Sequence, residues 1–316
     1  MNKPYDIIIV GAGAAGMTAA LYALRAKKSV LLLEQKVAGG QIVVTHKIDN
    51  FPAAPGISGL DFAKTLKQQV ESFGGEFEYA NVVKITTDGQ TFQVQTDDED
   101  ISPRAKSVIL APGSTERKLG LSHEESYIGH GVSYCATCDA NFYKGKTVAV
   151  YGAGNTALYS TLYLSNLAQK VYLINHGDHY RADQSLVEKA KTLKNVQILE
   201  NSAITALSGA KRLESITINH DKVLSLDGLF VSIGRVPDNT FLKDFIELDD
   251  QGYIKSDETC KTSRKGVFCA GDCRKKPVNQ LTTAVADGAV AASAAVEYLT
   301  HLCENNLESG EISSVG

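Results

Sequence analysis

Two cysteines in a Cys-x-x-Cys arrangement, Cys135 and Cys138, are followed directly by the acid Asp139. Thiols at this spacing can close a small reversible disulfide, and an adjacent carboxylate can carry the protons that dithiol chemistry moves. The dithiol stands between two glycine-rich turns, which begin at Gly11 and Gly152. This order predicts that electrons pass from a bound cofactor to a disulfide.

The first glycine-rich turn follows a buried-strand run, residues 7–10, and leads into a helical stretch, residues 17–27. In a dinucleotide-binding turn the first glycine makes the bend, the second admits a pyrophosphate, and the third packs helix on strand. The helix amino terminus then offers free N–H groups to the phosphates. Glu34, at the end of the next strand, can accept hydrogen bonds from ribose hydroxyls. This unit therefore predicts a nucleotide site.

The same order of elements returns from Val148 onward, with Gly152, Gly154 and Ala157 in the turn. Here Asn175 takes the place that Glu34 has in the first unit, so an acid for an unphosphorylated ribose is missing. The residues after it, His176, Gly177, Asp178, His179, Tyr180 and Arg181, do not supply a pair of arginines for a 2'-phosphate. The second nucleotide pocket is predicted to be degenerate.

Composition narrows the class of protein. The chain has 316 residues, 43% of them hydrophobic, with 32 basic and 36 acidic residues and a net charge of -4. This balance indicates a globular protein of two domains and disfavours nucleic acid or a membrane surface as a partner. The amino terminus lacks the features of a signal peptide. We expect a cytoplasmic protein.

The chain resembles the low-molecular-weight thioredoxin reductases, which are FAD-dependent dithiol enzymes. The resemblance covers nearly the whole length and is strongest where the cysteine block and a Gly-Asp block occur together. Its markers are Gly11-x-Gly13-x-x-Gly16 with Glu34, Gly39-Gly40-Gln41, Asn50-Phe51-Pro52, Ala111-Pro112-Gly113, Gly131 to Asp139, Gly234-Arg235-x-Pro237, Gly271-Asp272, Gln280, Thr283-Ala284 and Asp287-Gly288.

The resemblance implies an α/β fold of two Rossmann-like, FAD/NAD(P)-binding three-layer domains, the second inserted in the first. Residues 1–115 and 245–316 would form the FAD-binding domain, and residues 116–244 the NAD(P)-binding-like domain that carries the dithiol. Residues 113–120 and 238–244 would be the connecting strands and the hinge of a domain rotation. A strand run at residues 267–270 and an Ala-rich helix at residues 285–299 are natural completions of the first sheet.

The resemblance also implies roles for individual residues. Cys138 would be the thiol nearest the flavin, Cys135 the thiol that attacks the partner's disulfide, and Asp139 the proton relay. The resemblance implies thioredoxin as that partner, and a homodimer. The expected cofactor-binding residues are Gly11, Gly13, Ala14, Ala15, Gly16, Glu34, Gly40, Gln41, Asn50, Val83, Ala111, Gly113, Gly271, Asp272, Gln280, Leu281 and Thr282.

Departures from the family pattern bear on the electron donor. NADPH-using members carry a His-Arg-Arg run where this chain has Asn175, His176 and Gly177, and an arginine where it has Asn279. Losing two charge-assisted phosphate contacts costs on the order of 2–5 kcal/mol of binding. The pattern disfavours NAD(P)H and favours the branch of the family that ferredoxin reduces. The alternatives are an NADPH- or NADH-dependent thioredoxin-disulfide reductase, an FAD-dependent dithiol oxidase, and a redox sensor.

The remaining cysteines and two clusters of basic residues could form other sites. Cys135 and Cys138 could be half of a zinc site with Cys269 and Cys273, but that spacing is loose, and we expect no metal. Cys260, Cys269, Cys273 and Cys303 are predicted to be core or surface residues. Two basic clusters are candidates for docking an acidic ferredoxin or are plain solvated surface. They are Arg274 with Lys275 and Lys276, and Lys261 with Arg264 and Lys265.

Overall fold

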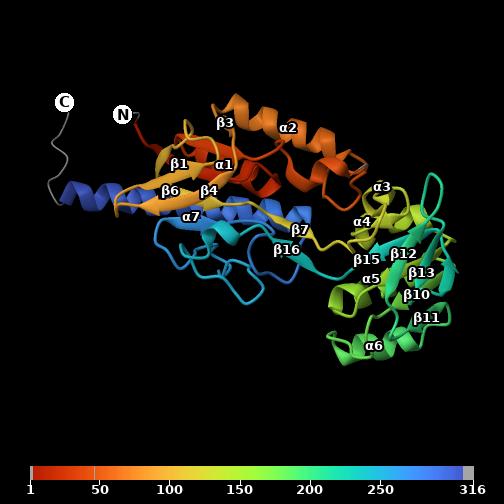
Figure 1. Ribbon diagram of the computed structural model, residues 1–316. Coiled ribbons are helices and arrows are strands. Elements are labelled where there is room, and N and C mark those ends of the chain that lie inside the picture. Colours follow the sequence, from red (N-terminus) through yellow and green to blue (C-terminus); the bar gives the residue numbers. More distant parts are fainter. Residues whose placement is uncertain (1–2, 46, 309–316) are drawn as a thin grey trace. The chain divides into compact units, whose positions relative to one another are not determined.

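The computed structural model describes residues 3–45 and 47–308 (Figure 1). The chain divides into two compact units. Unit 1 comprises the segments up to Thr115 and from Val236 onward, and unit 2 is the inserted segment Glu116–Arg235. Each unit is built on a mainly parallel sheet with a buried core on both faces, which confirms the predicted α/β fold of two Rossmann-like domains.

Unit 1 contains a sheet of strand order β3-β2-β1-β6-β5-β4, with β17 also paired to β6. Strands β1, β2, β3, β6 and β17 run parallel, whereas β4 and β5 form an antiparallel extension. The strands are β1 Tyr5–Val10, β2 Val30–Glu34, β3 Glu76–Tyr79, β4 Val82–Thr87, β5 Phe92–Thr96, β6 Arg104–Leu110 and β17 Val267–Cys269.

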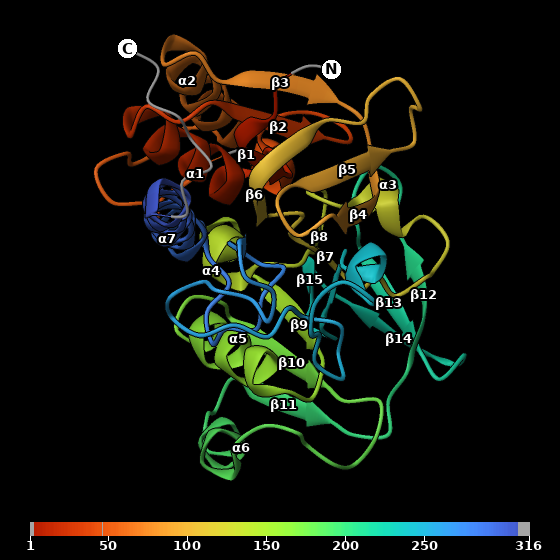
Figure 2. The same ribbon diagram turned by 90° about the vertical axis from the view of Figure 1, so that its left-hand side faces the viewer.

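The helices of unit 1 cover one face of this sheet. Helix α1 and helix α7 lie side by side, which Figures 1 and 2 both show, and they pack closely because small residues face each other. A Cβ atom on Gly288 of α7 would lie 2.3 Å from the carbonyl oxygen of Ala15 in α1. The helical segments are η1 Gly40–Val44, η3 Thr240–Leu242, α1 Ala14–Arg25, α2 Gly59–Ser72 and α7 Leu281–Glu308.

Strand β1 is buried on both faces because its apolar side chains alternate between two cores. Ile7 and Ile9 pack with α1 and α7, and Ile8 and Val10 pack with the antiparallel extension and the loop after η3. Burial of apolar area of this kind supplies most of the free energy that offsets the entropy cost of ordering the backbone. The sheet therefore holds the carboxyl ends of β1 and β2, where the predicted nucleotide site lies, in a fixed frame.

Unit 2 repeats the plan with a parallel sheet of order β11-β10-β9-β15-β8 and an antiparallel meander of β12, β13 and β14. Helices α4, α5 and α6 share one core with the sheet, and the meander shares the other. The strands are β8 Val132–Ser133, β9 Thr147–Tyr151, β10 Lys170–Ile174, β11 Val196–Leu199, β12 Ile204–Ser208, β13 Ser215–Ile218, β14 Lys222–Ser225 and β15 Gly228–Val231. The helical segments are α3 Glu124–Tyr127, α4 Ala136–Asp139, η2 Ala140–Tyr143, α5 Asn155–Ser165 and α6 Gln184–Lys191.

Two short strands carry the chain across the boundary. They are β7 (Ser114–Glu116) and β16 (Arg235–Pro237), and they pair with each other. The predicted second connector, residues 238–244, and the predicted return at residue 245 are therefore placed too late. The reason is packing: Leu242 and Ile246 are buried in the core of unit 1, and the Asn239 amide donates to the carbonyls of Gly252 and Cys273.

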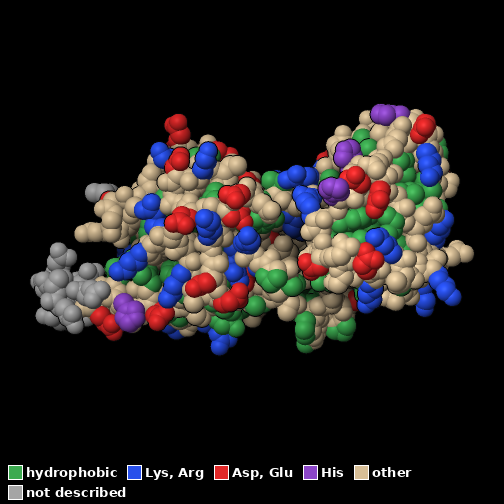
Figure 3. Space-filling view, turned by 90° about the horizontal axis from the view of Figure 1, so that it is seen from below, with side chains coloured by type: hydrophobic (Ala, Val, Ile, Leu, Met, Phe, Trp, Pro, Cys, Tyr) green, Lys and Arg blue, Asp and Glu red, His purple; other side chains and the backbone are tan. Residues whose placement is uncertain are grey.

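No helix within residues 3–45 and 47–308 has the length and apolar character that are needed to cross a membrane. On the face that Figure 3 draws, basic and acidic side chains are interspersed over each unit.

Candidate active site

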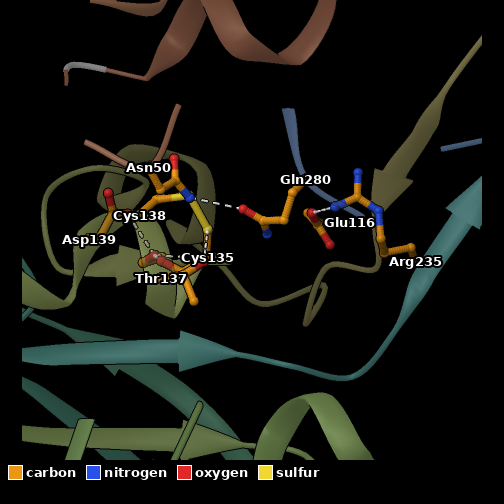
Figure 4. The surroundings of a disulfide bond; sticks show 9 residues. Asn50, Glu116, Cys135, Thr137, Cys138, Asp139, Arg235 and Gln280 are labelled. Carbon is orange, nitrogen blue, oxygen red and sulfur yellow. Dashed lines mark hydrogen bonds and ion pairs between the residues drawn. A yellow bond between two sulfur atoms is a disulfide. The ribbon is translucent and has the colours of Figure 1, made fainter. Parts of the chain in front are cut away.

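Cys135 and Cys138 form a disulfide whose Cα atoms are 5.3 Å apart (Figure 4). Cys135 precedes the single turn of α4, Cys138 lies within that turn, and both residues are half-buried. The Thr137 hydroxyl lies 3.4 Å from the Cys135 sulfur. Asp139 ends the turn, and its carboxylate receives the Ser133 hydroxyl at 2.7 Å. The dithiol and the acid that sequence reasoning picked out are thus held on one short turn.

A buried carboxylate anchors the segment before the dithiol. Glu124, only 3% exposed, accepts the backbone N–H groups of Leu119 at 2.8 Å and Gly120 at 2.9 Å, together with the Tyr134 hydroxyl. Burial and the neighbouring carboxylate raise the pKa of Tyr134 above its ordinary value, so its hydroxyl stays a donor. Through Glu124, Tyr134 is therefore held against residues 119–120, near the start of unit 2.

The first glycine-rich turn in unit 1 forms an open cradle at the amino terminus of α1. Gly11 has a φ of +97°, and a Cβ atom there would lie 2.2 Å from the Ala111 oxygen, so only glycine fits. Gly13 caps α1 without a side chain, and the nearest atom to a Cβ there would be the Gly39 oxygen at 3.9 Å. The helix N–H groups therefore face room that an anion can enter.

Glu34 lies at the end of β2, 8% exposed. One carboxylate oxygen accepts the N–H of Ala12 at 2.8 Å and the other accepts the N–H of Lys36 at 2.9 Å. A carboxylate has about four lone-pair sites, so two of them stay available for ribose hydroxyls. The hydrogen bonds hold the carboxylate beside the cradle in a single orientation.

The Gly271-Asp272 turn of unit 1 is held by a buried ionic network from α7. The Asp287 carboxylate accepts the N–H of Gly271 at 3.0 Å and two nitrogens of Arg274 at 3.0 and 2.9 Å. The Lys276 ammonium lies 3.0 Å from Asp287 and 3.3 Å from Asp272. Burial by itself would raise the pKa of Asp287, but the hydrogen bonds and charges of Arg274 and Lys276 outweigh it and hold the pKa below its usual value.

A pocket of about 370 Å³ opens at the carboxyl ends of β9 and β10 in unit 2. Asn175 lines it, and its amide makes two hydrogen bonds within its own loop: the nitrogen donates to the carbonyl of His179 at 3.1 Å, and the oxygen accepts the N–H of Gly177 at 3.1 Å. Asp178 lies 2.9 Å from the His179 ring, and Arg181 is an exposed cation in the lining. The loop therefore folds on itself around Asn175.

Comparisons with known proteins decide the family. The sequence pattern of the pyridine nucleotide-disulphide oxidoreductases matches residues 5–288. The chain belongs to this family.

Among its relatives, a thioredoxin reductase of Treponema pallidum is 40% identical over 310 residues, covering 96% of this chain and 99% of the relative. A "34.2 kDa protein in rubredoxin operon" of Clostridium pasteurianum is 38% identical over 304 residues, covering 94% and 98%. A crystal structure of thioredoxin reductase from Streptococcus pyogenes has a TM-score of 0.87 and 36% identity, covering 95% of this chain and 100% of that one.

As a member of the pyridine nucleotide-disulphide oxidoreductases, the chain is a flavoprotein, and FAD is its cofactor. The residues of unit 1 fit this group: the α1 cradle is open and uncapped, and Glu34 keeps acceptor capacity for a ribose. The Asn279 amide oxygen is buried without a hydrogen-bond partner in the described structure, as expected where a polar ligand supplies one. When FAD is bound, its flavin ring can carry two electrons.

The structure places the other predicted cofactor residues as follows. It brings Asn50 and Gln280 together, with the Asn50 amide donating to the Gln280 oxygen at 3.0 Å, although they are far apart in sequence (Figure 4). The Gln41 amide donates to the Ser114 carbonyl, and Val83 is an exposed side chain on β4. Gly16, Ala14 and Ala15 form the first turn of α1, Gly40 begins η1, Ala111 and Gly113 follow β6, and Leu281 and Thr282 begin α7.

One predicted docking surface is wrong. Arg274 and the side chain of Lys276 are each 4% exposed and paired with Asp287, so they do not form a solvated basic patch with Lys275. In the other cluster, Arg264 stacks on Phe245 at 4.5 Å and donates to its carbonyl at 2.8 Å. The sequence analysis did not predict the ion pairs of Arg274 and Lys276 because their partner, Asp287, lies on a separate helix. An acidic residue within an Ala-rich helical segment was the sequence feature that could have indicated them.

The free cysteines yield a testable prediction. Cys260, Cys269 and Cys273 are buried, and burial raises the pKa of Cys260 to about 12 and of Cys269 to about 11, and that of Cys273 as well. Because the thiolate is the reactive form, these thiols should be inert in the folded protein. A thiol-specific chromogenic disulfide should therefore modify only Cys303 while the Cys135–Cys138 disulfide is intact, and two further thiols after reduction. Fast reaction of more than one thiol before reduction would contradict this burial.

The described residues contain no cluster of His, Cys, Asp and Glu suited to a metal.

Proposed function

We propose that this protein is a thioredoxin-disulfide reductase in which electrons pass from FAD to the Cys135–Cys138 disulfide and then to the disulfide of thioredoxin. The observation that carries the proposal is the disulfide on the α4 turn with Asp139 hydrogen-bonded beside it. Relatives that match nearly the whole chain carry the name thioredoxin reductase. A reversible dithiol with an adjacent acid is the chemistry that such a name requires.

In this proposal unit 1 holds FAD through the α1 cradle, Glu34, and the Gly271-Asp272 turn. Cys138 is the thiol nearest the flavin, and Cys135 is the thiol that attacks the partner. Asp139 moves protons at the dithiol. The protein is proposed to act as a homodimer, which sedimentation of the FAD-loaded protein tests directly.

We further propose that the NADPH site of unit 2 is degenerate and that reduced ferredoxin is the electron donor. The support comes from the pocket: the Asn175 amide is bonded within its own loop, and Gly177 offers no cation. The Asp183 carboxylate lies 3.3 Å from the Asn155 amide at the amino terminus of α5, where it opposes a phosphate.

The fold of unit 2 requires a glycine at the start of its glycine-rich turn, even if no nucleotide binds there. Gly152 has a φ of +153°, and a Cβ atom there would lie 2.2 Å from the Ser232 oxygen, so the fold itself requires glycine. At Gly154 a Cβ would meet nothing within 4 Å, so the cradle remains open. In this proposal the turn is kept and the contacts to the 2'-phosphate are lost.

This account predicts a gain of NADPH binding in His176→Arg/Gly177→Arg. Two charge-assisted contacts restore about 2 kcal/mol or more, so the Kd for NADPH should fall about thirtyfold or more. NADH, which lacks the 2'-phosphate, is the matched control and should bind as weakly to the variant as to the wild type. Isothermal titration of the oxidised proteins measures both constants. Micromolar NADPH binding by the wild type would refute the degenerate site.

The direct test of the proposed function is anaerobic turnover of thioredoxin disulfide with each donor. The FAD-loaded enzyme is mixed with oxidised thioredoxin and reduced ferredoxin, and thioredoxin thiols are counted by alkylation and mass. One pair of thiols for every two electrons supplied supports the proposal. Flavin reduction that leaves thioredoxin oxidised would refute it and favour the dithiol oxidase.

A further inference from the structure

The hydroxyl of Ser133 joins three groups around the dithiol. Ser133 is the last residue of β8, pairs with Phe230 of β15, and is only 4% exposed. Its oxygen lies 2.7 Å from the Asp139 carboxylate, 3.1 Å from the Cys135 nitrogen and 3.3 Å from the Cys135 carbonyl oxygen. Because the strand is paired in the sheet, this hydroxyl has a fixed position relative to the turn.

The hydrogen-bonding capacity of a serine decides how these contacts are shared. A hydroxyl has one hydrogen and two lone pairs, and the Cys135 N–H can only donate, so it occupies one lone pair. The hydrogen then has two acceptors to choose from. The Asp139 oxygen at 2.7 Å is nearer than the Cys135 carbonyl at 3.3 Å, and a charged acceptor gives the stronger bond. While Asp139 is ionised, Ser133 donates to it.

The same three contacts also suit a protonated Asp139. The carboxyl group then donates to the second lone pair of Ser133, and the serine hydrogen turns to the Cys135 carbonyl. Each donor and acceptor around Ser133 keeps a partner in both states. Ser133 is thus suited to hold one orientation of Asp139 while its proton comes and goes.

We propose that Ser133 is a positioning residue for proton transfer by Asp139, an inference that rests on the proposed acid–base role of Asp139. The step concerned releases thioredoxin from its mixed disulfide with Cys135. The Cys138 sulfur attacks the Cys135 sulfur, and the Cys138 proton passes to Asp139. The Cys135–Cys138 bond forms, the bond between Cys135 and thioredoxin breaks, and the departing thioredoxin thiolate takes up the proton from Asp139. Two electrons have then passed from the dithiol to thioredoxin.

The test is a double-mutant cycle on the pre-reduced, FAD-loaded enzyme. The single-turnover rate of thioredoxin reduction is measured from pH 5 to pH 9 for wild type, Ser133→Ala, Asp139→Ala and the double variant. Acid–base catalysis typically raises a reaction rate by about 10²- to 10⁴-fold. Ser133→Ala should lower the single-turnover rate about tenfold. Because the serine hydroxyl pairs with Asp139 in both protonation states, its loss should lower the rate throughout this pH range.

In the Asp139→Ala background, Ser133→Ala should change the rate less than about twofold, because the two residues act through one step. A tenfold loss that persists there would show a purely structural role through the Cys135 N–H and would overturn the inference. So would an unchanged rate across the pH range in Ser133→Ala. Ser133→Thr, which keeps the hydroxyl, should retain the rate within about threefold. If the alanine variant does not fold, Ser133→Val, which has the shape of threonine without the hydroxyl, replaces it and should lose about tenfold.

The same experiment separates this inference from the proposed function. If the wild type does not reduce thioredoxin, the proposed function fails. If Asp139→Ala reduces thioredoxin at the wild-type rate, the acid–base role of Asp139 fails, and the inference about Ser133 fails with it.

Discussion

Replacing Cys138 with serine is expected to abolish thioredoxin reduction while FAD stays bound. Cys138 lies in unit 2 and the FAD cradle lies in unit 1, so the substitution leaves the cradle, Glu34 and the Asp287 network intact. A serine hydroxyl cannot form the Cys135–Cys138 disulfide through which both electrons pass. Turnover should fall to the background of free flavin, with an unchanged flavin-to-protein ratio measured by absorbance.

The roles of the two thiols are separated by trapping. Thioredoxin with one active-site cysteine, activated as a mixed disulfide with thionitrobenzoate, should form a covalent complex with Cys138→Ser, because Cys135 remains to attack it. Cys135→Ser should form this complex far more slowly. Both variants also carry Cys303→Ser, because the exposed Cys303 thiol could itself attack the activated thioredoxin, and Cys303→Ser alone is the matched control, which should turn over like the wild type. Normal turnover in Cys138→Ser, or faster trapping by Cys135→Ser, would contradict the assignment.

The second large effect is expected from Asp287→Asn in unit 1. Asp287 is 6% exposed, and its carboxylate balances the buried cations Arg274 and Lys276 while it holds the Gly271 N–H. Removing one partner of a buried ionic network leaves uncompensated charge and costs about 3–5 kcal/mol of unfolding free energy. Urea unfolding followed by circular dichroism measures this loss, and flavin release should shift to lower urea with it.

Asp49→Asn is the matched control because it removes the same charge from an exposed pair. Asp49 lies 2.9 Å from Lys47, with about half of each side chain in solvent, and such pairs contribute about 0–1 kcal/mol. Equal losses in the two variants would show that burial of the Asp287 network is unimportant.

The Asp287 network also makes stability depend on pH in a defined direction. The pKa of Asp287 in the folded protein lies below its usual value, so the stabilisation is fully present above the unfolded pKa of about 3.9. It is lost as the pH falls through the lower, folded pKa. The unfolding free energy of the wild type should therefore drop at acid pH, and that of Asp287→Asn should drop less.

Much of the fold was predictable because its patterns are local. Each glycine turn is flanked in sequence by the strand and helix that it joins, and the apolar runs at residues 7–10 and 148–151 are the central strands of the two sheets. The dithiol is a contiguous motif. The second connector was misplaced because burial of Leu242 and Ile246 depends on a distant sheet, which no local pattern reveals.

Contacts between distant segments and the directions of single side chains could not be predicted from the sequence. Arg274 and Lys276 look like surface cations until α7 brings Asp287 against them. The sequence shows that Asn175 stands where the first unit has Glu34, and the structure adds that its amide is hydrogen-bonded to Gly177 and His179. The contact between Ser133 and Asp139 depends on where β8 ends relative to the α4 turn.

The most direct test of the central claim is an anaerobic titration of the FAD-loaded enzyme with NADPH, then NADH, then reduced ferredoxin, in the presence of oxidised thioredoxin. Flavin absorbance and thioredoxin thiols are followed together. The account predicts that reduced ferredoxin bleaches the flavin once thioredoxin is exhausted, and that two thiols appear for each pair of electrons. Rapid bleaching by micromolar NADPH would contradict the proposed donor, and bleaching by every donor without thioredoxin thiols would contradict the path through Cys135 and Cys138.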